Sequence, residues 1–142
     1  MNLAVVDALT EEQTAQLCAL YQHEWWTAGR ELNDVRIMLR HTPIVIGLVS
    51  PDEEELLAFA RVLTDYTFKA LVLDVIVKSG YTGNGWGRVV MDRIMGHPDL
   101  QSVRHFELYC KPEMVPFYEK WGFTSDLGDL ALMRHQRKGD PS

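Results

Sequence analysis

The 142-residue sequence is poor in cysteine and has no long apolar run. Its two cysteines, Cys18 and Cys110, stand far apart, so neither a disulfide framework nor a zinc site is expected. No signal-like start precedes the first predicted strand, and we expect a cytoplasmic protein. No apolar stretch approaches the roughly 20 residues of a membrane helix, so no membrane partner is expected.

Basic residues are also scarce, with 14 Lys and Arg against 20 Asp and Glu and a formal charge of −6. Nucleic-acid phosphates are bound by clustered Lys and Arg, so a nucleic-acid partner is not expected, and a neutral or cationic small partner fits better. The five histidines lack ligand spacing on any one element, so no metal is expected. The hydrophobic content of 46% suits a single domain over residues 1–142.

Apolar spacing and the placement of Gly and Pro predict an alternation of strands and helices. Within the strand at 70–77, side-chain alternation predicts that Val72, Asp74 and Ile76 share one face. The aromatic-rich segment 21–30 is expected to be a helix end or a loop. Strands are expected at 2–7, 44–49, 56–63, 70–77, 104–110 and 130–133, helices at 10–21, 32–41, 86–95 and 112–120, and a frayed polar tail at 136–142.

A glycine-rich stretch at 82–87, Thr-Gly-Asn-Gly-Trp-Gly, lies between an apolar run and an amphipathic one. Glycine permits backbone conformations closed to other residues and leaves the N–H groups accessible to a ligand. Beside the positive end of a helix dipole, such N–H groups bind anions, so the loop predicts a phosphate or pyrophosphate site. Turns and close helix packing also use glycine, and these explanations stay open here.

The surroundings of this loop argue against two common nucleotide sites. A P-loop requires a lysine after its last glycine, whereas Arg88 and Val89 follow Gly87. A dinucleotide-binding loop follows the first strand and precedes an acidic residue about 20 positions later, whereas a predicted hairpin and a third strand come first here. Nucleotide hydrolysis and dinucleotide-dependent oxidoreduction are therefore not expected.

Two motifs together resemble the GNAT superfamily of N-acetyltransferases. The family's loop motif is Arg or Gln, two residues, Gly, one residue, then Gly or Ala, and Thr82, Gly85 and Gly87 occupy its positions. Thr82 stands where Arg or Gln is usual. The family's late signature, Phe-Tyr, three residues, Gly-Phe, is similar to residues 117–123. The resemblance covers residues 44–133 in the order of elements.

The resemblance implies an α/β (α+β) fold: a mixed, mostly antiparallel sheet flanked by about four helices, with a splayed strand pair forming an acetyl-CoA cleft. Backbone N–H groups in such a cleft would bind the thioester carbonyl and the pantetheine. Acetyl-CoA is thereby implied as the cosubstrate. The cofactor-binding residues implied are Val75, Ile76, Val77, Thr82, Gly83, Asn84, Gly85, Trp86, Gly87 and Arg88.

Two residues are candidates for catalysis. By resemblance, Tyr118 lies near the cofactor sulfur, where a phenol can donate a proton to the departing thiolate. A buried tyrosine bonded to a carbonyl is the alternative. Asp74 is the one charge in an apolar strand, so it must be paired, solvated or neutralised. It is a candidate general base or amine-binding group, and a structural salt bridge is the alternative.

The acceptor side is expected at the connection between the first two helices, which covers the acceptor cleft in the resembling fold. Its candidate substrate-binding residues are Glu24, Trp25, Trp26 and Arg30. Neighbouring tryptophans on a helix lie about 100° apart, so one of the pair should face a cleft or a dimer surface. A Trp face can hold a cationic amine and Glu24 can add charge. A hydrophobic cap on the core is the alternative.

The sequence thus predicts an acyltransferase that moves an acetyl group from acetyl-CoA to a primary amine of a small molecule or peptide, by direct transfer in a ternary complex. The alternative is a non-catalytic acyl-CoA binding or sensing domain. It is suggested by Thr82 in place of Arg or Gln, and by Lys111 and Met114 where many family members carry Asn and Ala. A homodimer is left open.

Overall fold

A five-stranded sheet organises residues 2–137, the part of the chain that the computed structural model describes. Its strands, β1 (Ala4–Val6), β2 (Ile44–Val49), β3 (Leu56–Thr64), β4 (Lys69–Val77) and β5 (His105–Leu108), have the same order in space as in sequence. The first four pair antiparallel. β5 pairs parallel to β4 because a helix crosses over between them. The mixed, mostly antiparallel sheet predicted from the sequence is confirmed.

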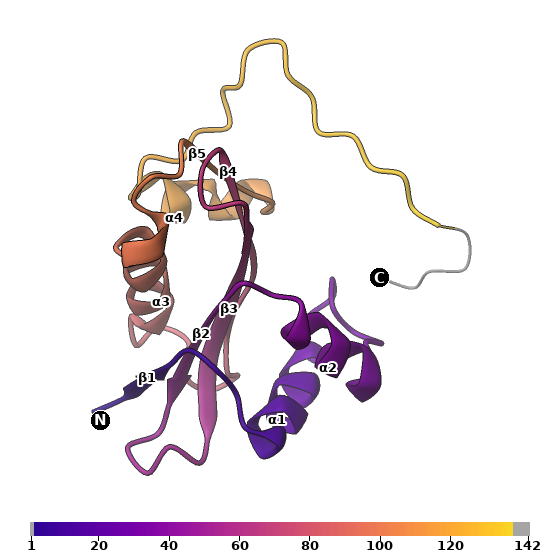
Figure 1. Ribbon diagram of the computed structural model, residues 1–142, viewed down its shortest axis with the longest axis vertical. Helices are drawn as coiled ribbons and strands as arrows, with labels where there is room; N and C mark the ends of the chain where they lie inside the picture. The colour runs from indigo at the N-terminus through magenta and orange to yellow at the C-terminus, as the bar shows by residue number, and fades with distance from the viewer. Residues whose placement is uncertain (1, 138–142) are drawn as a thin grey trace.

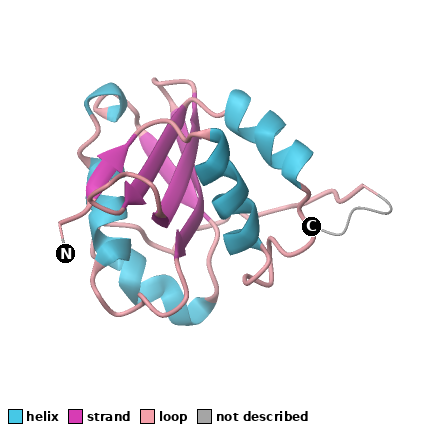
Figure 2. Cartoon of the chain, turned by 90° about the horizontal axis from the view of Figure 1, so that it is seen from below, coloured by secondary structure: helices cyan, strands magenta, loops and turns pink. Residues whose placement is uncertain are grey.

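Helices cover both faces of this sheet (Figures 1 and 2). α1 (Glu11–Tyr21) and α2 (Leu32–Arg40) lie on one face, and α3 (Trp86–Met95) and α4 (Val115–Glu119) lie on the other (Figure 1). α1 begins at the predicted cap, where Thr10 and Gln13 bond each other's backbone N–H groups. The helix predicted at 112–120 is divided into a 3₁₀ turn, η2 (Pro112–Met114), and α4. A second 3₁₀ turn, η1 (Pro98–Leu100), precedes β5.

The sheet separates two apolar clusters. On one side Val90 and Ile94 of α3 pack with Ala60 of β3, and on the other Leu17 and Tyr21 of α1 pack with strand residues. β2 is buried at every position because it is covered on both faces.

β4 reverses its side-chain alternation at Asp74, so the prediction that Val72, Asp74 and Ile76 share one face is wrong. Asp74 and the residue after it lie opposite a single residue of β3, and Asp74 has a φ of 56°. Such a bulge adds one residue to the strand and turns the following side chains to the other face. Val72 therefore packs in the α3 cluster, whereas Ile76 packs in the α1 cluster.

The strand predicted at 130–133 does not form within the described chain. Residues after Phe123 leave the sheet as an extended arm, on which Leu130, Leu132 and Met133 are exposed (Figure 1). Alternating apolar residues favour a strand, but a strand also needs a hydrogen-bonding partner. The predicted polar tail lies mostly outside the described residues, from position 138 onward.

Candidate functional site

The parallel pairing of β4 and β5 is short, and this opens the candidate site. It runs from Lys69 opposite His105 to Val72 opposite Leu108, after which β5 ends and β4 continues to Val77. Over residues 73–77 the edge of β4 that faces away from β3 has no strand partner among residues 2–137. Unpaired backbone N–H and C=O groups on such an edge can bind an extended ligand. The splayed strand pair predicted from the sequence is therefore present.

The glycine loop stands at the end of this unpaired edge, before α3. Gly83 and Gly85 have φ values of 90° and 80°, and a Cβ built on either would meet nothing within 4 Å. Backbone conformation rather than crowding therefore requires glycine at both positions. Gly87 differs, because it lies inside α3 and a Cβ there would be 3.4 Å from the Phe117 ring. That is an ordinary contact distance, so the packing of α3 on α4 would accept a small side chain at this position.

The N-terminus of α3 is left without a side-chain cap. The first helical hydrogen bond runs from the Val89 N–H to the Gly85 carbonyl at 3.2 Å. The N–H groups of residues 86–88 therefore have no partner within the helix. The rings of Tyr81 and Trp86 stack 5.0 Å apart beside them. Unlike α1 with its capping box, α3 thus offers several N–H groups and its positive dipole end to an anion.

Tyr118 of α4 is 8% exposed and packs edge-on against Phe117 and Phe123. Burial, with a smaller contribution from Cys110, raises the pKa of the Tyr118 phenol to about 12. Across residues 2–137 no hydrogen bond joins its hydroxyl to another protein group. The hydroxyl therefore keeps its proton at neutral pH and remains available as a donor.

One oxygen of the Asp74 carboxylate accepts hydrogen bonds from three donors. Its Oδ2 accepts from Arg61 Nε at 2.7 Å, from the Tyr21 hydroxyl at 2.8 Å and from Arg30 Nη1 at 2.9 Å. Burial opposes ionisation, but the charges and hydrogen bonds of Arg61 and Arg30 outweigh it and hold the pKa of Asp74 below its ordinary value. Burial, together with the charge of Asp74 and the hydrogen bond to it, raises the pKa of Tyr21. Asp74 is thus a fixed, ionised carboxylate and a weak base.

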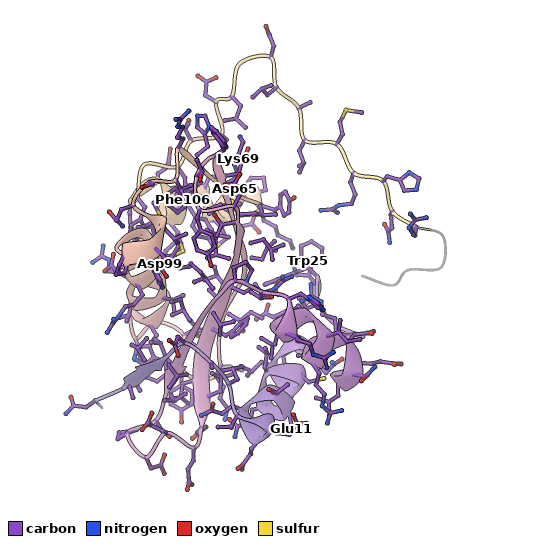
Figure 3. The ribbon with its side chains drawn as sticks, in the orientation of Figure 1. Glu11, Trp25, Asp65, Lys69, Asp99 and Phe106 are labelled. Carbon is purple, nitrogen blue, oxygen red and sulfur yellow. The ribbon has the colours of Figure 1, made fainter. Side chains whose placement is uncertain are left out.

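The acceptor-side residues divide into two groups. Arg30 is partly exposed and is held by the ion pair with Asp74, and its guanidinium also lies 4.7 Å from the centre of the Tyr21 ring. Trp25 and Trp26 are 69% and 36% exposed and contact each other edge-on. In Figure 3 Trp25 lies on the α1 side of the sheet, and its ring contacts a residue of the turn after β5.

That residue is Lys111, whose Nζ lies 4.6 Å from the centre of the Trp25 ring. The contact joins the connection between α1 and α2 to the chain that follows β5, near the point where β4 and β5 stop pairing. Glu24 lies beside Trp25, and partial burial raises its pKa while the charge of His23 lowers it less. Within the described residues no ion pair involves the Glu24 carboxylate. Glu24 is therefore less committed to protein contacts than Asp74.

Sequence reasoning missed Tyr21 and Arg61, and it marked Lys111 only as a departure from the family pattern. Arg61 could have been found, because it is the one charged residue in the apolar run of β3, as Asp74 is in residues 70–77 of β4. Charges in two adjacent buried strands need each other as partners. Tyr21 carried no comparable signal, and the sequence did not show the contact of Lys111 with Trp25, since both contacts depend on how the helices and turns meet the sheet.

No helix in the described part of the chain is long and apolar enough to cross a membrane. Among solved structures, an acetyltransferase of the GNAT family from Xanthomonas campestris pv. campestris has a TM-score of 0.86 and 29% identity, with 100% of this chain and 98% of that chain covered. Glucosamine-6-phosphate N-acetyltransferase from Arabidopsis thaliana, at 16% identity and a TM-score of 0.73, covers 99% of this chain and 100% of that chain and shares the fold.

Curated relatives include an uncharacterised N-acetyltransferase, ycf52, of Porphyra purpurea, 32% identical over 68% of this chain and 57% of its own length. Serotonin N-acetyltransferase 2, chloroplastic, of Oryza sativa subsp. japonica is 34% identical over 68% of this chain and 50% of its own length. The chain thus spans about half the length of the curated relatives it matches. The model of the acetyltransferase (GNAT) family matches residues 6–123. The chain therefore belongs to the GNAT family of acetyltransferases.

Proposed function

We propose that this chain transfers an acetyl group from acetyl-CoA to a primary amine of a small molecule or peptide, by direct transfer in a ternary complex. The family generally uses acetyl-CoA. The observation that carries the proposal is the uncapped N-terminus of α3, which follows a left-handed glycine turn at the end of the unpaired edge of β4. An anion site and a strand edge in series suit a long ligand with a pyrophosphate at one end.

Cofactor binding rests on backbone groups in this proposal. The N–H groups of residues 86–88 hold the pyrophosphate, with Arg88, Thr82 and Asn84 exposed beside them. The loop residues Gly83 and Gly85 shape the turn, and the edge formed by Val75, Ile76 and Val77 pairs with the pantetheine arm. Because these contacts come from the main chain, Thr82 in place of Arg or Gln removes one side-chain contribution and leaves the rest.

Tyr118 acts at the leaving group. A phenol with a pKa of about 12 is a weaker acid than an ordinary thiol, whose pKa is about 8.5. Complete proton transfer from Tyr118 to the departing thiolate would therefore be uphill. The hydroxyl contributes by donating a hydrogen bond to the sulfur as negative charge develops there, which lowers the barrier without requiring a free tyrosinate.

The amine is received on the α1–α2 side, by Trp25, Trp26 and Glu24. A cationic amine fits an exposed indole face next to a carboxylate. Asp74 contributes to the same side by holding Arg30 in place. None of its described hydrogen bonds uses Oδ1, and through that oxygen Asp74 would bind the amine or its proton.

A second function, acyl-CoA binding or sensing without turnover, is favoured by one observation. Lys111 lies against Trp25 across the strand gap and occupies the indole face that an amine would use. In a sensing domain this contact would persist with cofactor bound. In an acetyltransferase the acceptor must displace it.

The two functions are separated by measuring binding and turnover on the same protein. Calorimetric titration with coenzyme A reports binding, and free-thiol release with acetyl-CoA reports turnover against a polyamine, an amino acid, an arylalkylamine and a peptide. Binding with turnover on one of these supports the transferase. Binding without turnover on any of them supports the sensor, and a chain that does not bind coenzyme A contradicts both. A cytoplasmic location belongs to this proposal as the compartment predicted from the sequence.

A further inference from the structure

The C-terminal arm, residues 124–137, exposes apolar side chains that a self-contained chain would bury. Leu127, Leu130, Leu132 and Met133 are 53%, 76%, 68% and 89% exposed. Single exposed apolar residues are normal on protein surfaces, but a contiguous set marks an interaction site. The arm therefore presents an apolar surface that the described part of the chain leaves uncovered.

The local sequence of the arm favours a β-strand as the bound form. Residues 130–133 are apolar and were predicted as a strand, yet the described hydrogen bonds of the arm close local turns, such as Leu130 N–H to the Leu127 carbonyl at 3.3 Å. Extended backbone without a ladder leaves N–H and C=O groups open to pairing. A strand with open backbone groups adds most readily to the edge of an existing sheet.

β5 supplies such an edge. It is the last strand of the sheet and pairs with β4 on one side, and no strand of the described residues lies on its other side. The His105 N–H donates to the Phe68 carbonyl in the direction of β4 at 3.1 Å, so by strand alternation the backbone groups of Phe106 and Leu108 point to the open side. Phe106 is labelled in Figure 3, at the end of the molecule from which the arm departs.

Aromatic side chains next to this edge are only partly covered. They belong to the α3-side cluster, are contributed by α4 and the turn after it, and comprise Phe117, Trp121 and Phe123. A strand laid along β5 would cover apolar surface here as well as satisfy its backbone groups. Natural proteins protect such sheet edges, because an open edge is a template for pairing with another chain.

The arm does not pair with its own β5. In Figure 1 it rises beyond β5 and crosses toward the α1–α2 side. There the Arg134 guanidinium lies 5.8 Å from the centre of the Tyr109 ring. Such a surface cation–π contact stabilises by less than the entropy that ordering a few residues removes. Fully extended, the arm reaches roughly 45 Å, which is enough to cross to a neighbouring molecule.

We propose that the arm pairs as a β-strand with the open edge of β5 in a second copy of this chain, in a reciprocal exchange. Each copy carries a strand-forming segment without a strand partner and an open edge on β5. A two-fold exchange pairs the segment and the β5 edge in both copies at once, so the contact closes on itself and gives a dimer rather than a filament. The inference does not depend on acetyl transfer.

The first test measures the mass of the full chain by sedimentation equilibrium. We expect twice the chain mass of 16.3 kDa for the parent, and a dissociation constant raised at least 100-fold by Leu132→Asp. The matched control His135→Asp adds the same charge to the arm outside the apolar segment and should stay dimeric. Because Leu132 is 68% exposed, its replacement should leave the thermal unfolding curve of the monomer cooperative. Leu132→Pro, which removes the backbone donor that pairing with β5 would use, should dissociate the dimer similarly.

The second test locates the pairing by amide hydrogen exchange. Exchange at Phe106, Leu108 and Leu132 should slow by roughly 100-fold or more in the parent dimer, and this protection should be lost in Leu132→Asp. A monomeric parent with a protected Leu132 amide would mean that the arm folds back on its own β5 and would overturn the proposal. A dimer that Leu132→Asp leaves intact, or a monomer with an unprotected arm, would overturn it too.

Discussion

Arg61 of β3 and Asp74 of β4 form an ion pair between adjacent strands, with Arg61 Nε 2.7 Å from Asp74 Oδ2. Their side chains are 11% and 3% exposed, so the pair is shielded from water. The bulge at Asp74 is what turns the carboxylate to the face that Arg61, Tyr21 and Arg30 share. The polar contacts of Asp74 therefore depend on the bulge in β4, because the bulge places the carboxylate on that face.

Asp74→Asn should destabilise the fold by about 3 kcal/mol, because it leaves two guanidinium groups without their carboxylate. Urea unfolding measures this loss, and Arg61→Met with the double variant serves as the control. The double variant should lose less than the sum of the two single changes, since the partners interact directly.

The same variant tests the role of Asp74 with the acceptor. We expect the KM for the best amine to rise while the affinity for coenzyme A stays close to that of the parent, as measured by steady-state kinetics and calorimetry. A variant that acetylates its best amine as well as the parent does would make Asp74 purely structural.

The depressed pKa of Asp74 predicts a specific dependence of stability on pH. A carboxyl whose folded pKa lies below its unfolded value of about 3.9 contributes full stability above that value. The contribution is lost as the pH falls through the folded pKa. Urea unfolding from pH 7 down to pH 3 should show a steeper loss below pH 4 in the parent than in Asp74→Asn. Equal slopes would contradict the ion-pair assignment.

Gly85→Ala and Gly87→Ala form a matched pair in the loop. At Gly85, with a φ of 80°, a side chain costs about 1–2 kcal/mol and distorts the turn, so the affinity for coenzyme A should fall at least tenfold. Gly87 lies in α3, where alanine favours the helix and its Cβ meets the Phe117 ring at an ordinary distance, so its affinity should change little. Gly85→Glu, which adds a repelling charge, should abolish binding. Unchanged calorimetric affinity in Gly85→Glu would place the ligand elsewhere.

Tyr118→Phe should lower kcat by about 10- to 1,000-fold, with little change in coenzyme A affinity. Its thermal stability should stay near that of the parent, because the Tyr118 hydroxyl has no described protein partner. Tyr21→Phe is the contrasting control, since it removes a hydrogen bond to the buried Asp74 and should destabilise by about 1–3 kcal/mol. With the pKa of Tyr118 at about 12, its ionisation should leave no inflection in the rate between pH 6 and 10. Parental turnover in Tyr118→Phe would assign the residue to packing.

Local patterns in the sequence were sufficient for most elements. The apolar face and the following glycine predicted α3 with the bounds that it has, and Thr10 with Gln13 predicted the start of α1. These signals are reliable because capping, helical periodicity and the left-handed glycine turn involve residues within a few positions of each other. The glycine loop and the uncapped N–H groups at the start of α3 were predictable for the same reason.

Tertiary structure alone decided the contacts between elements. No local pattern marks the bulge that turns Asp74 toward Arg61, because it depends on how β4 pairs with β3. The contact of Trp25 with Lys111 joins residues 86 positions apart and forms only where the α1–α2 connection meets the turn after β5. At 130–133 the sequence carries the intrinsic preference for a strand, but pairing is a property of two strands, and the described chain places none beside it.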